Sequence, residues 1–147
     1  MELDDSIHDN ITDLCEQGDA LAAEGGQRGA LSHYRQAWAM LPEPKNDWDA
    51  ATWILSAIGD AHFGLREYPD AITALQVALK CPDGLGNPFI HLRLGEAHFE
   101  SGNQDRAGDE LTRAYMAAGR DIFEGEDPKY VTFLRSILQP GPGEEDL

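Results

Sequence analysis

This 147-residue chain lacks the signatures of common enzymes, secreted proteins and membrane proteins. It has no HExxH, GxSxG or P-loop sequence, and its nearest approach to GxGxxG, Gly84-Leu85-Gly86, has no third glycine. Its two cysteines, Cys15 and Cys81, form no CxxC pair, so we expect buried, reduced thiols. No apolar run approaches the roughly 20 residues that cross a bilayer, and no signal segment opens the chain. We therefore expect a non-catalytic cytoplasmic protein without cofactor.

Basic residues are also scarce. The chain has 11 Lys and Arg against 27 Asp and Glu, a net charge of −16. Such a charge repels nucleic-acid phosphates and anionic lipids, so neither is an expected partner. The sequence favours another protein, of basic character, as the partner, and leaves the oligomeric state open.

What the chain does contain is an internal repeat. A Gly-acid-Ala tripeptide occurs three times, as Gly18-Asp19-Ala20, Gly59-Asp60-Ala61 and Gly95-Glu96-Ala97. Each glycine is followed 12 residues later by alanine, 16 later by a bulky residue and 19 later by alanine: Ala30, Tyr34 and Ala37; Ala71, Leu75 and Ala78; Ala107, Leu111 and Ala114. Small residues let two helices approach closely, and the bulky residue fills the remaining space. The pattern predicts helix-turn-helix units that stack on one another.

At these residues the chain resembles the tetratricopeptide repeat, whose period is about 34 residues. The resemblance implies an all-α fold, an α-solenoid of three helix-turn-helix units over residues 11–44, 52–85 and 88–121, with a capping helix at 127–138. Residues 1–10 are then an acidic lead-in and 139–147 a disordered acidic tail. The spacing is uneven, because Ala30 to Ala71 is 41 residues (71 − 30) and Ala71 to Ala107 is 36 (107 − 71). We place the insertions between the copies, at residues 43–51 and 85–87.

Start and stop signals set the expected helices at about 7–24, 27–41, 48–65, 69–80, 88–101, 105–118 and 127–138. Asn46 or Asp47 is the expected cap of the third helix, and Asp127-Pro128 opens the last one. The last helix carries an apolar stripe suited to covering the open end of a stack, formed by Tyr130, Phe133, Leu134 and Ile137.

In the first helix of each repeat copy, residues at spacings of three and four form a row that lies on a different face from the residues packed in the core. In tetratricopeptide proteins this row lines the inner surface, so the resemblance implies a partner-binding surface of acidic and aromatic residues: Asp19, Asp49, Trp53, Ser56, Asp60, Phe63, Phe89, Arg93, Glu96, Phe99 and Glu100. Carboxylates beside aromatic rings suit Lys or Arg side chains. The aromatics can equally be core residues, and the acids a solvated face.

Histidines raise the alternative of a metal site, which we do not expect. His62 and His98 occupy one repeat position and are interpreted as packing residues with a satisfied ring N–H. His91 and His98 are seven residues apart, which is too far for one metal ion without a ligand between them.

Two functions are compatible with these features. The family's chaperone-tail clamp needs Lys, Arg and Asn on this row to hold a terminal carboxylate. The matching positions here are Cys15, Asp19, Ala57, Phe89 and Arg93, of which only Arg93 could serve, so the resemblance does not extend to this clamp. The segment 114–130, with Phe133 and Leu134, resembles the ending of tetratricopeptide-type immunity proteins of bacterial polymorphic toxin systems. The first hypothesis is therefore an inhibitor of one basic toxin or enzyme, and the alternative is a general adaptor or co-chaperone that binds a peptide motif.

Overall fold

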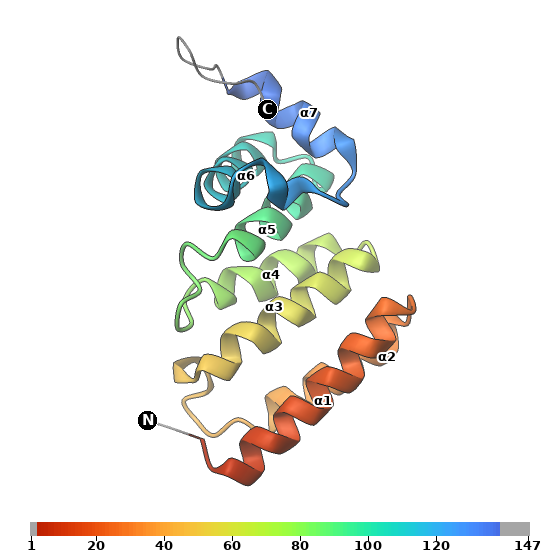
Figure 1. The fold of residues 1–147 in the computed structure, drawn as a ribbon, viewed down its shortest axis with the longest axis vertical. Coiled ribbons are helices and arrows are strands. Elements are labelled where there is room, and N and C mark those ends of the chain that lie inside the picture. The colour runs from red at the N-terminus through yellow and green to blue at the C-terminus, as the bar shows by residue number, and fades with distance from the viewer. Residues whose placement is uncertain (1–2, 139–147) are drawn as a thin grey trace. The chain divides into compact units, whose positions relative to one another are not determined.

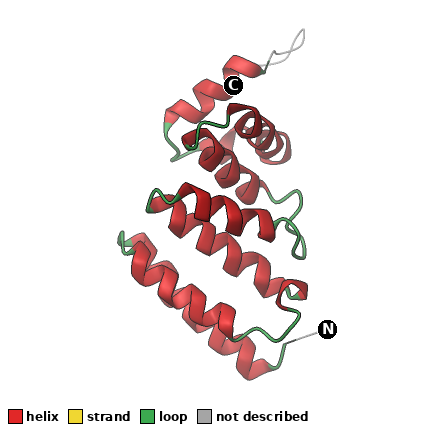
Figure 2. Cartoon of the chain, turned by 180° about the vertical axis from the view of Figure 1, so that it is seen from behind, coloured by secondary structure: helices red, strands yellow, loops and turns green. Residues whose placement is uncertain are grey.

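The computed structural model describes residues 3–138, and within this range it contains helices and loops without any strand (Figure 2). The α-helices are α1 (Asp5–Ala23), α2 (Gln27–Ala39), α3 (Asp49–Gly64), α4 (Tyr68–Ala78), α5 (Pro88–Glu100), α6 (Gln104–Ala118) and α7 (Pro128–Ile137). Two short 3-10 helices are η1 (Lys45–Asp47) and η2 (Arg120–Phe123). The expected all-α fold is confirmed. The predicted tail at 139–147 lies outside the described residues.

The chain forms two compact units, residues 1–85 and residues 86–147. Unit 1 holds the hairpins α1/α2 and α3/α4, and unit 2 holds the hairpin α5/α6 followed by η2 and α7 (Figure 1). The repeat domain over residues 11–138 stays a prediction, because only the arrangement inside each unit is defined. No helix among residues 3–138 is long and apolar enough to cross a membrane.

The predicted packing of small against large residues holds in every hairpin. A Cβ added to the repeat glycine would lie 2.5 to 2.8 Å from the bulky side chain 16 residues later, closer than packed carbon atoms approach. The pairs are Gly18 with Tyr34, Gly59 with Leu75, and Gly95 with Leu111. Because the large residues are buried, each glycine sets the distance between the two helices of its hairpin.

The three hairpin turns share a left-handed residue at one repeat position. Gly25 has φ +85°, Arg66 has φ +62° and Gly102 has φ +85°. Glycine adopts this conformation without a steric cost, whereas a residue with a Cβ is strained there. The turn between α3 and α4 therefore keeps the backbone of the other two turns despite its arginine.

The start of α3 differs from the prediction. Neither Asn46 nor Asp47 caps it, because both belong to η1, and the N-cap is Trp48, whose side chain makes no capping hydrogen bond. Lys45 holds η1 against the end of α2, since its Nζ donates to the carbonyl oxygens of Leu41 at 2.6 Å and Trp38 at 3.1 Å. The insertion after the first hairpin is thus an ordered segment.

The last helix packs within unit 2 as the apolar stripe indicates. Tyr130 and Leu134 are buried, and Phe99 of α5 makes edge contacts with Tyr130 and Phe133 at centroid distances of 5.5 and 5.2 Å. Asp127 caps α7 by accepting from the Lys129 N–H at 3.0 Å. The predicted cap-plus-proline start of α7 is confirmed.

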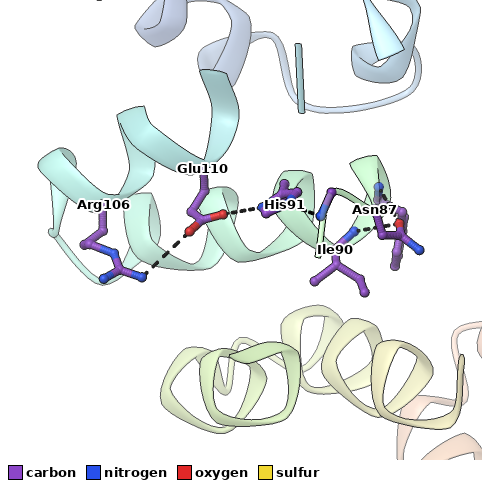
Figure 3. A network of polar contacts seen from close by, with 7 residues as sticks. Asn87, Ile90, His91, Arg106 and Glu110 are labelled. Carbon is purple, nitrogen blue, oxygen red and sulfur yellow. Dashed lines mark hydrogen bonds and ion pairs between the residues drawn. The ribbon is translucent and has the colours of Figure 1, made fainter. Parts of the chain in front are cut away.

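A buried histidine links the start of α5 to α6 (Figure 3). His91 Nε2 accepts from the Gly86 N–H at 3.1 Å, so Nδ1 carries the proton and donates to Glu110 Oε2 at 2.6 Å. Arg106 lies 3.7 Å from the other oxygen of Glu110. Asn87 caps α5 beside this network by accepting from two backbone N–H groups. His91 thereby fixes Gly86, which precedes α5, to the α5/α6 hairpin.

Candidate functional site

A pocket of about 320 Å³ opens in unit 1 where α1 and α3 begin. Two of the sequence-predicted contact residues, Asp49 and Trp53, lie in it. Its lining residues are Leu3, Asp5, His8, Trp48, Asp49, Ala50 and Trp53. The pocket thus combines carboxylates, an imidazole and indole rings.

The first turn of α1 supplies one wall of the pocket. Asp4 caps the helix, because its carboxylate accepts from the Ser6 N–H at 2.9 Å and the Ser6 hydroxyl at 2.7 Å. These bonds lower the pKa of Asp4 and keep it in its charged, accepting form. The helix therefore begins at Asp5, earlier than the predicted residue 7, and His8 follows one turn later.

The start of α3 supplies the other wall. The Trp48 indole is buried and its Nε1 donates to the Pro42 carbonyl oxygen at 2.8 Å, which fixes the ring. Asp49 and Trp53 are one turn apart on the helix, so their side chains share a face. The Trp53 side chain remains 38% exposed, unlike Trp48 at 8%. One tryptophan is therefore part of the framework and the other is available for contact.

The pocket has an acidic character. Within residues 3–138, the carboxylates of Asp5 and Asp49 make neither a hydrogen bond nor an ion pair. Each lies in the first turn of a helix, where the helix dipole is positive and offsets part of its charge. The two carboxylate charges are larger than the partial positive charges at the starts of α1 and α3, so the pocket remains negative. The arrangement can therefore bind a cationic group whose stem packs on Trp53.

Sequence reasoning missed five of the lining residues, which are Leu3, Asp5, His8, Trp48 and Ala50. The first three fall in the segment interpreted as an acidic lead-in, although the helix that contains Asp5 and His8 starts there. The signal that could have found them is Asp4 followed by Ser6, a capping pattern at a helix start. Helix α1 thus begins two residues before its predicted start at about residue 7 and takes up more of the lead-in predicted over residues 1–10 than expected.

Other predicted residues of unit 1 lie outside the pocket and have partners within the unit. Asp19 accepts from the Tyr34 hydroxyl at 2.6 Å, and burial together with this bond raises the pKa of Tyr34. The Phe63 ring packs edge-on against Tyr68 at 5.5 Å. The Ser56 hydroxyl donates to the Thr52 backbone oxygen at 2.7 Å. The Asp19–Tyr34 and Phe63–Tyr68 contacts each join the two helices of a hairpin, whereas the Ser56 bond lies within α3, where Asp60 is half-buried.

The acidic row predicted for unit 2 is not a free surface. Glu96 has no exposed area, and Arg93 Nη1 contacts Glu96 Oε1 at 2.5 Å and Glu126 Oε1 at 2.6 Å. The expectation of an exposed Glu96 is therefore wrong. The physical reason is that the segment between α6 and α7 brings Glu126 onto this side of α5, where Arg93 joins the two carboxyl groups.

Helix α7 engages two more predicted residues. Glu100 accepts from the Tyr130 hydroxyl at 2.8 Å and lies 2.5 Å from Lys129 Nζ, and these contacts lower its pKa against the opposing effect of burial. Phe99 is held between aromatic rings of α7, as described above. Phe89 alone among the predicted aromatics of unit 2 stays exposed, at 38%, with the Arg93 guanidinium 5.3 Å from its ring centre.

The repeat histidines differ from each other. His62 Nδ1 lies 3.0 Å from Glu67 Oε1, as expected for a satisfied ring. His98 Nε2 is buried without a hydrogen-bond partner within the described range, so the expectation fails for that nitrogen. Burial, with the nearby Arg106 charge, lowers the pKa of His98 and favours its neutral form.

Comparisons with known proteins support the fold. No protein-family model and no curated protein matches the chain. Among solved structures, the first TPR domain of the human RPAP3 protein is similar with a TM-score of 0.66 and 18% identity, over 87% of this chain and 89% of that one. The Yersinia enterocolitica type III secretion translocator chaperone SycD is similar with a TM-score of 0.69 and 14% identity, over 88% and 92% of the two chains.

A third similar structure is the first TPR of Spaghetti (RPAP3) bound to the HSP90 peptide SRMEEVD, with a TM-score of 0.68, 18% identity and coverage of 88% and 90%. These similarities agree with the glycine-to-large packing pairs and the three equivalent turns. The chain has the fold of a tetratricopeptide-repeat domain.

Proposed function

We propose that this chain is a non-catalytic protein-interaction module that binds a basic segment of a partner protein, with the pocket of unit 1 as its contact point. One observation carries the proposal. The carboxylates of Asp5 and Asp49, which have no hydrogen-bond or ion-pair partner among residues 3–138, share a pocket with the exposed Trp53 indole. Both carboxylates are exposed, and an exposed aromatic ring beside them in the same pocket favours a cationic ligand from outside the chain.

The chemistry suits one Lys or Arg side chain. An ammonium or guanidinium group can approach the carboxylates while its aliphatic stem covers Trp53, and a cation–π contact contributes about 0.5–2 kcal/mol depending on desolvation. Arginine fits better, because its flat guanidinium can stack on the indole and still donate to a carboxylate. The net charge of −16 adds long-range attraction that speeds the encounter with a basic partner.

The test is a titration followed by NMR amide and indole signals. The probe is the capped pentapeptide Gly-Gly-Arg-Gly-Gly, and the matched control is the same peptide with citrulline, which keeps the shape and removes the charge. We expect saturable shifts of the Trp53 indole and the Asp49 amide with arginine and much smaller shifts with citrulline.

Variants locate the binding site. Asp49→Asn and Trp53→Ala should each weaken binding, whereas Asp105→Asn, an exposed position in unit 2, changes the net charge equally and should leave it intact. Equal loss in Asp49→Asn and Asp105→Asn would reduce the effect to overall charge and contradict the proposed pocket.

A narrower function within this proposal is that of an immunity-type inhibitor, which covers one basic toxin or enzyme. The high negative charge supports it, because capture must precede damage. It requires a tight one-to-one complex that abolishes the activity of the partner, measured by co-purification and by rescue of growth on co-expression.

The alternative is an adaptor, which the peptide-bound RPAP3 structure favours as a use of this fold. That peptide contains three acidic residues. Asp5 and Asp49 would repel such a ligand. An adaptor built on this chain should therefore bind short basic motifs weakly and in several partners.

A further inference from the structure

A cluster of side chains able to bind a metal ion lies at the turn between α3 and α4, at the opposite end of α3 from the pocket. His62 in the last turn of α3, Glu67 before α4 and Asp70 in its first turn each offer one ligand atom, and these atoms lie within 4.8 Å of one another. His62 Nδ1 and Glu67 Oε1 are 3.0 Å apart. Two ligands bound to one metal ion at about 2.0–2.2 Å are separated by a similar distance.

The backbone holds the three positions in place. The Glu67 N–H donates to the His62 carbonyl oxygen at 2.9 Å, which closes the turn around the left-handed Arg66. The His62 side chain is only 10% exposed, so packing fixes its ring. All three residues belong to unit 1 and to one hairpin. The three ligand atoms therefore all come from the α3/α4 hairpin.

The equivalent turn of unit 2 shows that the fold does not require these side chains. At the same repeat positions, each 36 residues later, it has His98, Asn103 and Arg106. Asn103 caps its helix there, since its side chain accepts from the Arg106 N–H at 3.2 Å. Glu67, in contrast, makes no capping hydrogen bond and directs its carboxylate to His62. The carboxylates of Glu67 and Asp70 are therefore not needed to form a turn of this kind.

The Glu67 carboxylate already forms an ion pair with the Arg28 guanidinium. Arg28 of α2 makes two hydrogen bonds to it, at 2.8 and 3.3 Å, while its own side chain stays 70% exposed. An exposed guanidinium contributes little free energy and can move into solvent. A doubly charged ion would compete with it favourably.

We propose that His62, Glu67 and Asp70 bind one divalent transition-metal ion of the Zn²⁺ type, which displaces Arg28 from Glu67. One imidazole with two carboxylates suits such ions, whereas Mg²⁺ and Ca²⁺ prefer oxygen ligands alone. Three protein ligands leave a coordination position for water or for a side chain of a partner. The site is independent of the proposed pocket.

The test is calorimetric titration of the full chain with zinc chloride and, as the chemical control, with magnesium chloride. We expect one Zn²⁺ per chain and no comparable Mg²⁺ binding. The matched variant is Glu67→Asn with Asp70→Arg, which copies the residues of the equivalent turn and should weaken Zn²⁺ binding by roughly tenfold or more. The variant Arg28→Gln removes the competitor and should bind Zn²⁺ more tightly.

Two controls distinguish Zn²⁺ binding at this site from Zn²⁺ binding by the cysteines and from unfolding of a variant. The variant Cys15→Ser with Cys81→Ser should keep full Zn²⁺ affinity, because the thiols are buried and burial raises the pKa of both. Glu67→Gln serves as a milder variant if the double variant loses its far-UV helical signal. Unchanged affinity in Glu67→Gln, or no Zn²⁺ binding by either the native chain or Arg28→Gln, would overturn the proposal.

Discussion

Replacing Glu96 with glutamine should stabilise the protein at neutral and alkaline pH and remove part of its pH dependence. Burial, followed by the adjacent Glu126 carboxyl, raises the pKa of Glu96 to about 9, against the opposing effect of the Arg93 charge. The folded protein therefore keeps Glu96 protonated at pH values where the unfolded chain has released this proton. Glutamine is neutral in both states and can still accept from Arg93.

The magnitude follows from proton linkage. With a pKa of 4.5 in the unfolded chain and about 9 in the folded one, the native state holds one more proton than the unfolded state between these values. The stabilisation is complete below the unfolded pKa and is lost as pH rises through the folded pKa. The free energy of unfolding should fall by about 1.4 kcal/mol per pH unit in this window, or about 2.7 kcal/mol over about two units.

The assay is urea unfolding of the native chain and Glu96→Gln at about pH 6, 7 and 8, followed by far-UV circular dichroism. The comparison cancels the titration of other groups, including the histidines, which both proteins share. The difference in unfolding free energy should grow in favour of the variant as pH rises. A difference that is constant with pH would show that Arg93 holds Glu96 ionised, and the reasoning would then be wrong.

Three further predictions concern the repeat framework, each checked by denaturant or thermal unfolding. Gly59→Ala should destabilise the protein by about 1–3 kcal/mol, because its Cβ would overlap the buried Leu75 side chain; a neutral effect would show that the helices can move apart. Arg66→Gly should stabilise it by up to about 1 kcal/mol by relieving the positive φ; an unchanged or lower stability would show that this turn gains nothing from glycine. Ending the chain before Asp127 should uncover Phe99 and lower the melting temperature, since each buried large apolar side chain contributes about 1.5–3 kcal/mol; an unchanged melt would exclude a capping role for α7.

Most of the helical framework could be predicted because its rules are local. Glycine paired with a large residue 16 positions later identifies a hairpin, and Pro88 and Pro128 lie in the first turns of α5 and α7 as expected. The start of α3 could not be predicted in this way. Lys45 orders the segment before α3 by donating to the carbonyl oxygens of Trp38 and Leu41, and this side-chain-to-backbone contact is not among the capping and spacing patterns that predicted the other helices.

The candidate site was only partly predictable, since helical phase gives a residue's face but not what covers it. Phase placed Asp49 and Trp53 correctly beside each other. The same rule placed Glu96 and Glu100 on an open face, where Glu126 and residues of α7 engage them instead. Those partners come from about 30 residues farther along the chain, beyond the reach of a local pattern.

The hairpin contact between a glycine and a large residue also bears on how such chains diverge. Tyr34 and Leu75 fill the same kind of space, yet only the tyrosine adds a hydroxyl bond, to Asp19. The space accepts different shapes provided that its opposite wall stays a glycine. A glycine followed 16 positions later by a large residue of any shape should therefore identify such hairpins even where their other positions differ.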